Sequence, residues 1–356
     1  MKKIKMIDLF CGAGIGAVGF KDAGFEIVHA IDSSKHAVRT YRKNIGDHVV
    51  CEDIRDTEVD SIPEADIIVG GFPCQSFSFS GKSLGEKDEK NGDLADYFFK
   101  VISMKRPKVF MLENVKGIAS KKHKEFFDLL LKSFEEEGYV LTKEVVNCLD
   151  YGLPQKRQRV FVVGVREDLN KVFSFPDKVD GHKTIRDVIG DLPEPIDYSV
   201  AKNDKSCLRN HYGVGIRKDE MKFIDKVPTG GNWKDIPEDD QKVFLGKSFY
   251  SGGGKTGYLR KMSFDSYALT ITSTIDGKFN AQIIDNKDKY GKIIKGIPKS
   301  RRYTVRECLR IQTVPDWFAF DDDIPLRKQY EGCGNGIPSE MTKILGCAII
   351  EQIFKS

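Results

Sequence analysis

Residues 4–19 have the sequence IKMIDLFCGAGIGAVG, in which an apolar run passes directly into a glycine-rich turn. Glycine lets a strand turn sharply into a helix and lets a ligand approach bare backbone. Gly12, Gly14, Gly16 and Gly19 include the spacing GxGxxG, and Asp32 stands at the end of the next apolar run. An acid at that place typically accepts hydrogen bonds from a ribose diol. Several nucleotide-type cofactors fit this pattern, and a purely structural turn is the competing interpretation.

Five further apolar runs follow before position 166, and segments of helical character separate them. The runs are 26–31, 66–71, 108–114, 139–146 and 159–165, and the helical segments include 35–43, 93–104 and 121–137. Strands that alternate with helices indicate βαβ units and a parallel sheet with helices on both faces. We therefore predict an α/β, Rossmann-like domain.

The composition of the chain changes after about residue 180, where Gly, Pro, Asp and Lys become frequent and the helical periodicity of apolar residues weakens. Residues 181–325 are predicted to form a smaller, irregular domain of strands and loops. An apolar helical pattern returns at 338–354 and is expected to pack on the first domain. The predicted domains are thus 1–180 with 326–356, and 181–325.

Composition excludes several classes of protein. The 356 residues carry 57 Lys and Arg against 53 Asp and Glu, a net charge of +4 that permits a nucleic-acid partner without requiring one. The eight cysteines and six histidines are dispersed, with no CxxC pair, so no metal site is expected and the thiols are expected to be reduced in a cytoplasm. The longest uncharged run, 67–81, is too short to span a bilayer, and Asp8 interrupts the stretch that a signal peptide would need. A cytoplasmic protein without a membrane partner is predicted.

Reactive side chains follow three of the apolar runs. Cys74 lies in GGFPCQSFS, residues 70–78, and Glu113 closes the run at 108–114. Ligands of open parallel sheets bind beyond the carboxyl ends of the strands, so both residues are expected at the mouth of a site. Strand alternation places Arg157 and Arg159 on one side, together with Gln155. The competing interpretations are a buried thiol at Cys74, an acid at Glu113 that caps neighbouring amides, and a solvated, charged entry to the strand at 155–159.

A second acid with an apolar neighbour, Asp53-Ile54, stands at the expected end of a third strand. Such a pair could hold an adenine, with the carboxylate accepting from the exocyclic amine and Ile54 covering the ring. In isolation, a solvated acid beside a core residue is the better interpretation.

Taken together, these blocks resemble the cytosine-C5 DNA methyltransferases of the bacterial or phage modification type, and they occur in the order of that family. The matching pieces are DLFCGAGIG (8–16), Asp32, Asp53-Ile54, GGFPCQSFSFSGK (70–82), ENVKG (113–117), YGLPQKRQRVF (151–161), RRYTVRECLRIQTVP (301–315) and GNGIP (334–338). The resemblance covers positions 1–165 and the C-terminal part from about position 301 onward. The middle segment corresponds to the target-recognition region, where Thr270-Ile271 resembles a characteristic Thr-(Leu/Ile/Val) pair.

The resemblance implies S-adenosylmethionine as the cofactor. The residues implied to bind it are Phe10, Cys11, Gly12, Ala13, Gly14, Ile15, Asp32, Ser33, Asp53, Ile54, Gly71, Pro73, Leu94, Asn335 and Gly336. Ser33 stands where some members place an aromatic residue that stacks on adenine. Stacking is therefore expected to fall to Ile54 and Phe10.

The resemblance also implies catalytic roles. Cys74 would be the nucleophile that adds to C6 of a flipped cytosine, and Glu113 the acid at N3. Arg159 would bind the cytosine O2, and Arg157 would steady the catalytic loop. The implied DNA contacts are Gln75, Ser80, Lys82 and Thr270, and the implied partner is double-stranded DNA. A monomer is expected, and a restriction endonuclease encoded nearby is a further partner that this resemblance raises.

Three alternatives stay open at this point. A tRNA cytosine methyltransferase on the same scaffold shares the Cys and Glu blocks, although the long middle segment favours DNA. A nicotinamide-dependent dehydrogenase explains GxGxxG alone, and a catalytically silent DNA-binding module leaves Cys74 and Glu113 without a role. Residues 287–310 hold nine Lys and Arg against two acids, which suits either phosphate neutralisation or a solvated surface.

Overall fold

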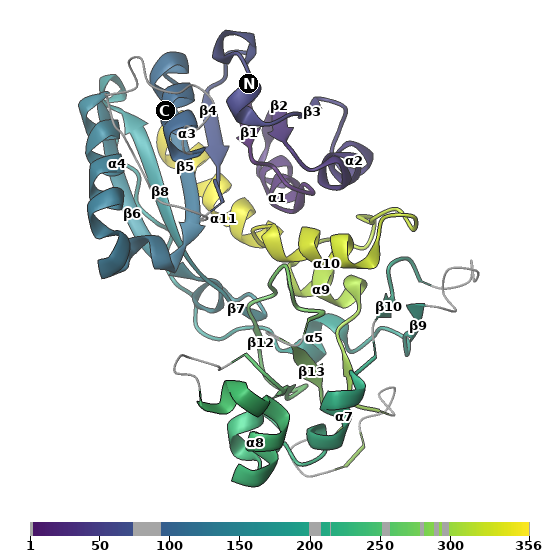
Figure 1. Cartoon of the computed structure of the whole chain (residues 1–356). Helices are drawn as coiled ribbons and strands as arrows, with labels where there is room; N and C mark the ends of the chain where they lie inside the picture. The colour runs from purple at the N-terminus through teal and green to yellow at the C-terminus, as the bar shows by residue number, and fades with distance from the viewer. Residues whose placement is uncertain are drawn as a thin grey trace. The chain divides into compact units, whose positions relative to one another are not determined.

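A computed structural model describes residues 3–73, 94–198, 208–213, 215–250, 257–277, 281–287, 292–293 and 299–355. The chain divides into two compact units (Figure 1). The first unit comprises 1–151, 157–179 and 336–356, and the second comprises 152–156 and 180–335. No helix in the described part of the chain is long and apolar enough to cross a membrane.

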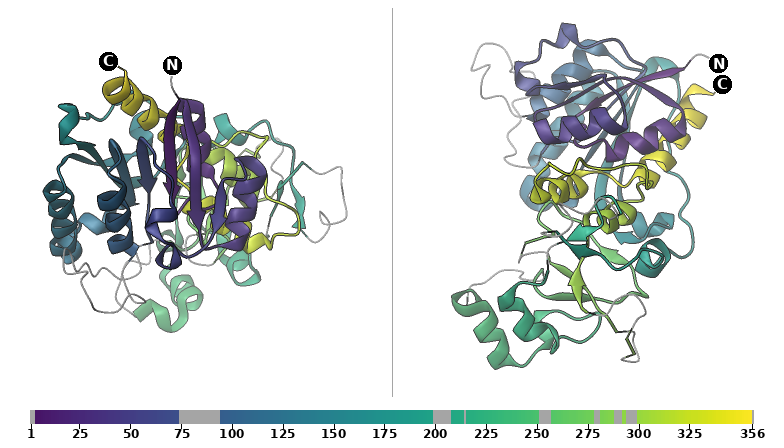
Figure 2. Two further views of the ribbon diagram at one scale, coloured as in Figure 1. Left: turned by 90° about the horizontal axis from the view of Figure 1, so that it is seen from above. Right: turned by 90° about the vertical axis from the view of Figure 1, so that its right-hand side faces the viewer.

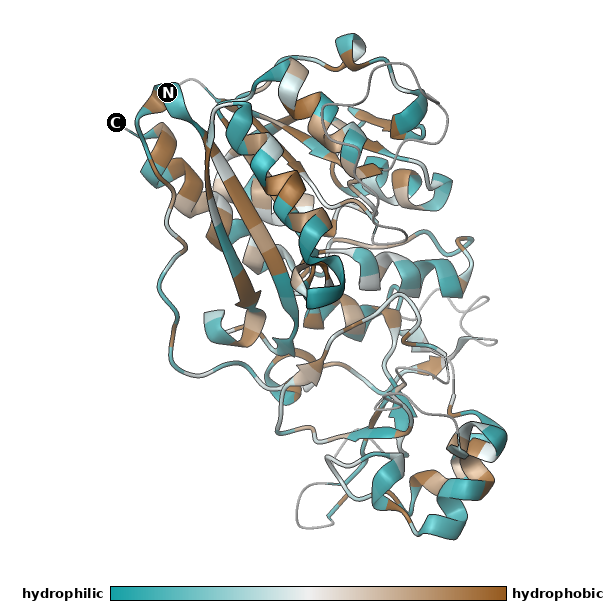
Figure 3. Ribbon diagram, turned by 60° about the vertical axis from the view of Figure 1, so that its left-hand side comes forward, coloured by the Kyte–Doolittle hydropathy of each residue, from teal (hydrophilic) through white to brown (hydrophobic). Residues whose placement is uncertain are grey.

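A seven-stranded sheet organises the first unit, with the strand order β3-β2-β1-β4-β5-β8-β6. The strands are β1 (Ile4–Leu9), β2 (Phe25–Asp32), β3 (Val49–Cys51), β4 (Ile67–Gly70), β5 (Val109–Val115), β6 (Tyr139–Asn147) and β8 (Gln158–Arg166). The pairs from β3 to β5 are parallel, which confirms the predicted α/β class. Apolar residues run along these strands (Figure 3).

One strand departs from the all-parallel sheet that the sequence predicted. β8 is antiparallel to both of its neighbours, β5 and β6. Residues 148–157 join β6 to β8 and contain only a short 3₁₀ helix, Cys148–Tyr151, and the two-residue strand β7 (Gln155–Lys156). Because a parallel connection needs a crossover, usually a helix, this short link returns the chain in the opposite direction.

Helices cover both faces of the sheet (Figure 2). They are α1 (Ile15–Ala23), α2 (Lys35–Asn44), α3 (Leu94–Lys105), α4 (Lys124–Glu136) and α11 (Ser339–Ile349). The Thr342 hydroxyl on α11 donates to the carbonyl oxygen of Gly16 on α1 over 2.8 Å. The return of the C-terminal helix to the first part of the chain is thereby confirmed.

An aromatic cluster anchors β5. Phe98, Phe110 and Phe134 are fully buried, and the ring centroids of Phe110 and Phe134 lie 4.4 Å apart. Burying each such side chain contributes about 1.5–3 kcal/mol. The cluster therefore holds rigidly the strand that carries Glu113.

The described residues of the second unit form three small sheets and several short helices. The strands are β7 with β12 (Ala268–Leu269), β11 (Arg260–Met262) with β13 (Gln282–Ile284) and β14 (Arg301–Arg302), and β9 (Ile196–Asp197) with β10 (Tyr212–Gly213). The helices are α5 (Ile185–Ile189), α7 (Lys218–Ile224), α8 (Glu238–Leu245), α9 (Val305–Ile311) and α10 (Leu326–Asn335). The sequence did not predict these helices, because such short elements give too weak a periodic apolar signal. The capping boxes at Thr184 and Thr304 were the available signal.

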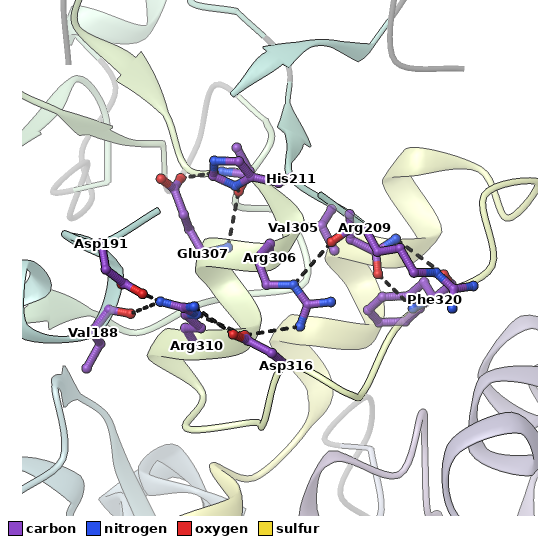
Figure 4. Close-up of polar contacts among 12 residues, drawn as sticks. Val188, Asp191, Arg209, His211, Val305, Arg306, Glu307, Arg310, Asp316 and Phe320 are labelled. Carbon is purple, nitrogen blue, oxygen red and sulfur yellow. Dashed lines mark hydrogen bonds and ion pairs between the residues drawn. The ribbon is translucent and has the colours of Figure 1, made fainter. Parts of the chain in front are cut away.

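Ion pairs within the second unit take up part of the positive charge of residues 287–310, and Figure 4 shows those that Arg306 and Arg310 make with Asp316. Arg302 pairs with Glu220, and Arg301 pairs with Glu307 at 2.7 Å. Arg310 bonds Asp316 through two nitrogens, at 2.9 and 2.6 Å, and the Arg306 Nε donates to a backbone carbonyl over 3.1 Å. These arginines stabilise the second unit from within. The charge left for phosphates is correspondingly smaller than the sequence count suggested.

Candidate functional site

The carboxyl edge of the large sheet gathers most of the predicted site residues of the first unit. The parallel strands β1, β2, β4 and β5 all end there, and β8 begins there because it runs the other way. Phe10 to Gly14, Asp32, Gly71, Glu113 and Arg159 therefore lie along one edge of one sheet. Such an edge is where open α/β sheets bind ligands.

The turn after β1 is held by the carboxylate of Asp32. Its Oδ2 accepts from the backbone N–H of Gly12 at 2.9 Å, and its Oδ1 accepts from the N–H of Ser34 at 2.8 Å. Gly14 adopts a left-handed φ of 88°, which favours glycine, as the chain enters α1. Each carboxylate oxygen has a second lone pair, so Asp32 can still accept from ribose hydroxyls.

Two more polar groups lie close to this turn: Asp8, which is buried near the end of β1, and Cys11, which is partly buried. Burial, reinforced by the charge of Asp32, raises the pKa of Asp8 to about 8. Burial also raises the pKa of the Cys11 thiol, so this thiol is a poor candidate for a nucleophile. Sequence reasoning did not single out the burial of Asp8, although a charge inside the apolar run 4–10 was a visible signal.

Asp53 already has a partner in the protein. The Arg55 guanidinium meets its carboxylate twice, with Nε···Oδ1 at 2.9 Å and Nη2···Oδ2 at 2.6 Å, and this pairing lowers the pKa of Asp53. Ile54 beside it is buried. An adenine amine at Asp53 would have to share the carboxylate with Arg55, which sequence reasoning did not single out.

Glu113 and Arg159 form an ion pair on one face of the sheet. Glu113 lies opposite Phe161 and Arg159 opposite Val115, so the two side chains are diagonal neighbours, with Nε···Oε1 at 2.9 Å. A Cβ on Gly71 would lie 3.0 Å from the Glu113 Oε2, a tight contact, so a side chain at this position would require the carboxyl to shift slightly. Burial raises the pKa of Glu113, and the charges of Arg159 and Arg157 oppose that rise.

Arg157 is fully buried, and burial, with Arg159 nearby, lowers its pKa to about 10. Its carbonyl oxygen accepts from the Cys148 N–H at 3.0 Å. The expected single strand through Gln155, Arg157 and Arg159 is interrupted at Arg157. β7 ends at Lys156 in the second unit, whereas β8 begins at Gln158 in the first.

The remaining predicted residues fall into three groups. In the first unit, Ala13 and Ile15 are buried, and Gly336 lies against Ile15. Leu94 is the first residue of α3, whereas Ser33 and Pro73 are exposed. Asn335 and Thr270 belong to the second unit. Cys74, Gln75, Ser80 and Lys82 lie outside the described residues. Among the residues that the structure describes, no group of three or more His, Cys, Asp or Glu could hold a metal.

Comparisons with known proteins find relatives that match nearly the whole chain. Type II methyltransferase M.Sau96I of Staphylococcus aureus is 32% identical, with 99% of this chain and 77% of that protein covered. Type II methyltransferase M.MthTI of Methanothermobacter thermautotrophicus is also 32% identical, with 97% and 96% covered. The crystal structure of a Spodoptera frugiperda DNMT2 variant, 17% identical, matches 99% of this chain and all of its own with a TM-score of 0.67, which shows a shared fold.

The profile of the C-5 cytosine-specific DNA methylase family matches residues 4–351, nearly the whole chain. Together with these two relatives, each 32% identical over nearly all of this chain, that match settles the family. The chain belongs to the C-5 cytosine-specific DNA methylases, enzymes that methylate cytosine in DNA at C5.

Proposed function

We propose that this protein transfers a methyl group from S-adenosylmethionine to C5 of a cytosine flipped out of a specific duplex DNA sequence. The observation that carries the proposal is the ion pair of Glu113 and Arg159 at the carboxyl edge, 2.9 Å apart, in which both side chains are mostly but not fully buried. An acid with a raised pKa beside a fixed cation suits the Watson–Crick edge of a cytosine, where N3 and O2 lie side by side.

The residues at the glycine turn fit an adenosine-type cofactor. Asp32 offers acceptor lone pairs for a ribose diol, and the buried Ile54 offers an apolar surface beside Asp53. Phe10 packs against the apolar cluster that includes Ile54 and Phe72, and its ring meets that of Phe72 edge to face, with centroids 6.5 Å apart. When bound there, S-adenosylmethionine supplies an electrophilic methyl group.

The chemistry begins with the thiolate of Cys74, which forms a bond to C6 and makes C5 nucleophilic. Glu113 donates a proton or a strong hydrogen bond to N3 as negative charge builds there, and Arg159 donates to O2. C5 then takes the methyl group while the bond from the methyl carbon to the sulfonium sulfur breaks, and the electron pair stays on the sulfur as a neutral thioether. Loss of the C5 proton to a base returns the electron pair that expels the Cys74 thiolate, and the 5-methylcytosine is released.

Cytosine C6 cannot be reached inside a duplex, so the base must leave the stack. Gln75, Ser80 and Lys82 would contact the opened duplex beside Cys74, and the segment around Thr270 would contribute to recognising the target. We propose that the protein acts as a monomer in the cytoplasm and that a restriction endonuclease recognises the same sequence. The names of the Type II relatives support that pairing.

A mechanism-based trap tests this proposal. Duplex DNA with 5-fluorocytosine at the target should form a covalent adduct that requires S-adenosylmethionine, because fluorine replaces the C5 proton whose loss normally expels the thiolate. Bisulfite sequencing of host DNA after expression first identifies the target. The adduct should survive denaturing electrophoresis and map to the peptide that contains Cys74.

Cys74→Ser should form no adduct, because a hydroxyl is a far weaker nucleophile at neutral pH. Cys347→Ser is the matched control, since Cys347 is exposed on α11, and it should form the adduct at the native rate. An adduct at Cys11 or Cys333 would overturn the site, and an adduct with fluorinated tRNA instead of duplex DNA would overturn the substrate.

A further inference from the structure

The backbone around Thr270 is held on one side by β7 and its flanking residues. The Ala268 N–H donates to the Pro154 carbonyl oxygen over 2.8 Å, and the Thr270 hydroxyl donates to the Lys156 carbonyl oxygen over 2.9 Å. The Ile271 N–H donates to the side-chain oxygen of Gln155 over 2.9 Å. Residues 268–271 thus run beside a neighbouring strand of only two residues.

Within the described ranges, no second backbone ladder borders this strand, and on its other side a side chain fills the place of one. Gln282, at the start of β13, accepts from the Leu269 N–H over 3.0 Å through Oε1. Its Nε2 donates to the carbonyl oxygens of Leu269 and Thr270 over 3.2 and 3.1 Å. Its amide therefore makes the bonds that the peptide of an adjacent strand would make.

Burial makes these bonds costly to lose. Gln282, Gln155 and Gln312 are each fully buried. Gln155 also donates to the Gln312 side-chain oxygen over 2.9 Å, and Gln312 donates to the Cys333 carbonyl oxygen over 2.5 Å. A buried polar group that loses its hydrogen-bond partner destabilises the fold by its full desolvation free energy. A displacement of residues 268–271 that broke these bonds would therefore be costly.

We propose that Gln282 is a positioning residue for target recognition. Its side-chain amide holds the backbone of Leu269 and Thr270 in the position from which Thr270 would contact the DNA. The inference rests on the proposed function, since it assigns Gln282 to the segment that would contact the duplex. Gln282 does not itself touch the DNA in this proposal. It sets where Thr270 stands, and a displacement of about 1 Å at a positioned group can change a rate by about 10²-fold.

The test uses Gln282→Met in the full-length enzyme, with Gln241→Met as the matched control. Gln241 lies in the same unit and also donates through Nε2 to two backbone carbonyls, those of Lys234 and Ile236, at 3.0 and 2.8 Å. Both variants lose amide bonds to backbone, but only Gln282 holds the Thr270 segment. The target sequence and the sites methylated off target are read first for the native enzyme by bisulfite sequencing.

Gln282→Met should raise KM for the target duplex and reduce the ratio of target to off-target methylation by about tenfold or more. Its affinity for S-adenosylmethionine should equal that of the native enzyme. Gln241→Met should keep the native KM and ratio even if its melting temperature falls. Native discrimination by a folded Gln282→Met, or equal losses in both variants, would overturn the inference.

Gln282→Glu gives a second readout that does not depend on the first variant folding. A carboxylate would face two carbonyl oxygens, whereas the protonated acid would regain one donor and keep the acceptor for the Leu269 N–H. Its KM for duplex DNA should therefore improve relative to the native enzyme as the pH falls from 8 to 6. A pH profile parallel to the native one would contradict the positioning role. Failure of the proposed function is distinguishable, because the native enzyme would then leave duplex DNA unmethylated.

Discussion

Replacing Asp32 tests the cofactor assignment most directly, and the structure shows that the substitution must be chosen with care. The carboxylate accepts from the N–H groups of Gly12 and Ser34 at 2.9 and 2.8 Å. Hydrogen bonds to a charged group contribute about 1.5–3 kcal/mol each. Asp32→Ala therefore removes on the order of 3–6 kcal/mol from the turn itself, a large part of the total stability of a typical domain.

Asp32→Asn is the sharper perturbation because it keeps one oxygen acceptor. Its amide nitrogen must face either the Gly12 or the Ser34 N–H, so about one backbone bond is lost. Two ribose hydroxyls bonded to the native carboxylate would contribute about 3–6 kcal/mol, and the loss of half should weaken cofactor binding roughly 10- to 100-fold. The complete loss in Asp32→Ala should weaken it about 10²- to 10⁴-fold.

Isothermal titration calorimetry with S-adenosylmethionine measures the affinities, and thermal unfolding without cofactor measures the cost to the fold. Asp22→Asn is the matched control, because Asp22 is an exposed carboxylate on the neighbouring helix α1. It should keep native affinity and stability. A folded Asp32→Asn that binds the cofactor as tightly as the native protein would refute the ribose assignment.

Three further predictions concern the acid, the division of labour and the pH response. Glu113→Gln should slow adduct formation about 10²- to 10⁴-fold in rapid-quench assays, since an amide cannot deliver the N3 proton, whereas Glu144→Gln on β6 should react at the native rate. A chimera that carries a relative's segment for 181–300 should methylate that relative's target with unchanged cofactor affinity, and retention of the original target would contradict this. The pKa of Asp8 in the folded protein, about 8, lies above the ordinary 3.8, so the folded state holds the proton longer and stability falls as pH rises between these values. Denaturant titrations should show that loss, at most about 1.4 kcal/mol per pH unit, reduced in Asp8→Asn, and equal slopes would exclude Asp8 as its source.

The sequence predicted features that depend on local pattern. Apolar runs marked the strands at 4–9 and 109–115, and glycine spacing with Asp32 marked the turn. It could not predict features that depend on partners distant in the chain. The direction of β8 is seen only from its antiparallel pairing with β5, from which α4 and β6 separate it in the chain. The buried pair Arg302–Glu220 joins residues 82 positions apart. The pairing of Asp53 with Arg55 is local, but competition between a salt bridge and a ligand is decided by geometry that periodicity does not encode.

The short segment 152–156 has a consequence for how new specificities can arise. It belongs to the second unit although the chain returns to the first unit at Arg157, and it supplies β7, the strand on which β12 pairs. If a genetic exchange replaced only the long segment 180–335, the β12 of the new segment would have to pair with the β7 already present in the chain. The segments 152–156 and 180–335 must therefore be exchanged together, or β7 must be able to pair with the β12 of different new segments. Ala268 and Thr270 use the carbonyl oxygens of Pro154 and Lys156, groups that every residue offers. Ile271 instead uses the side chain of Gln155, so an incoming segment keeps all three bonds only where β7 retains this glutamine.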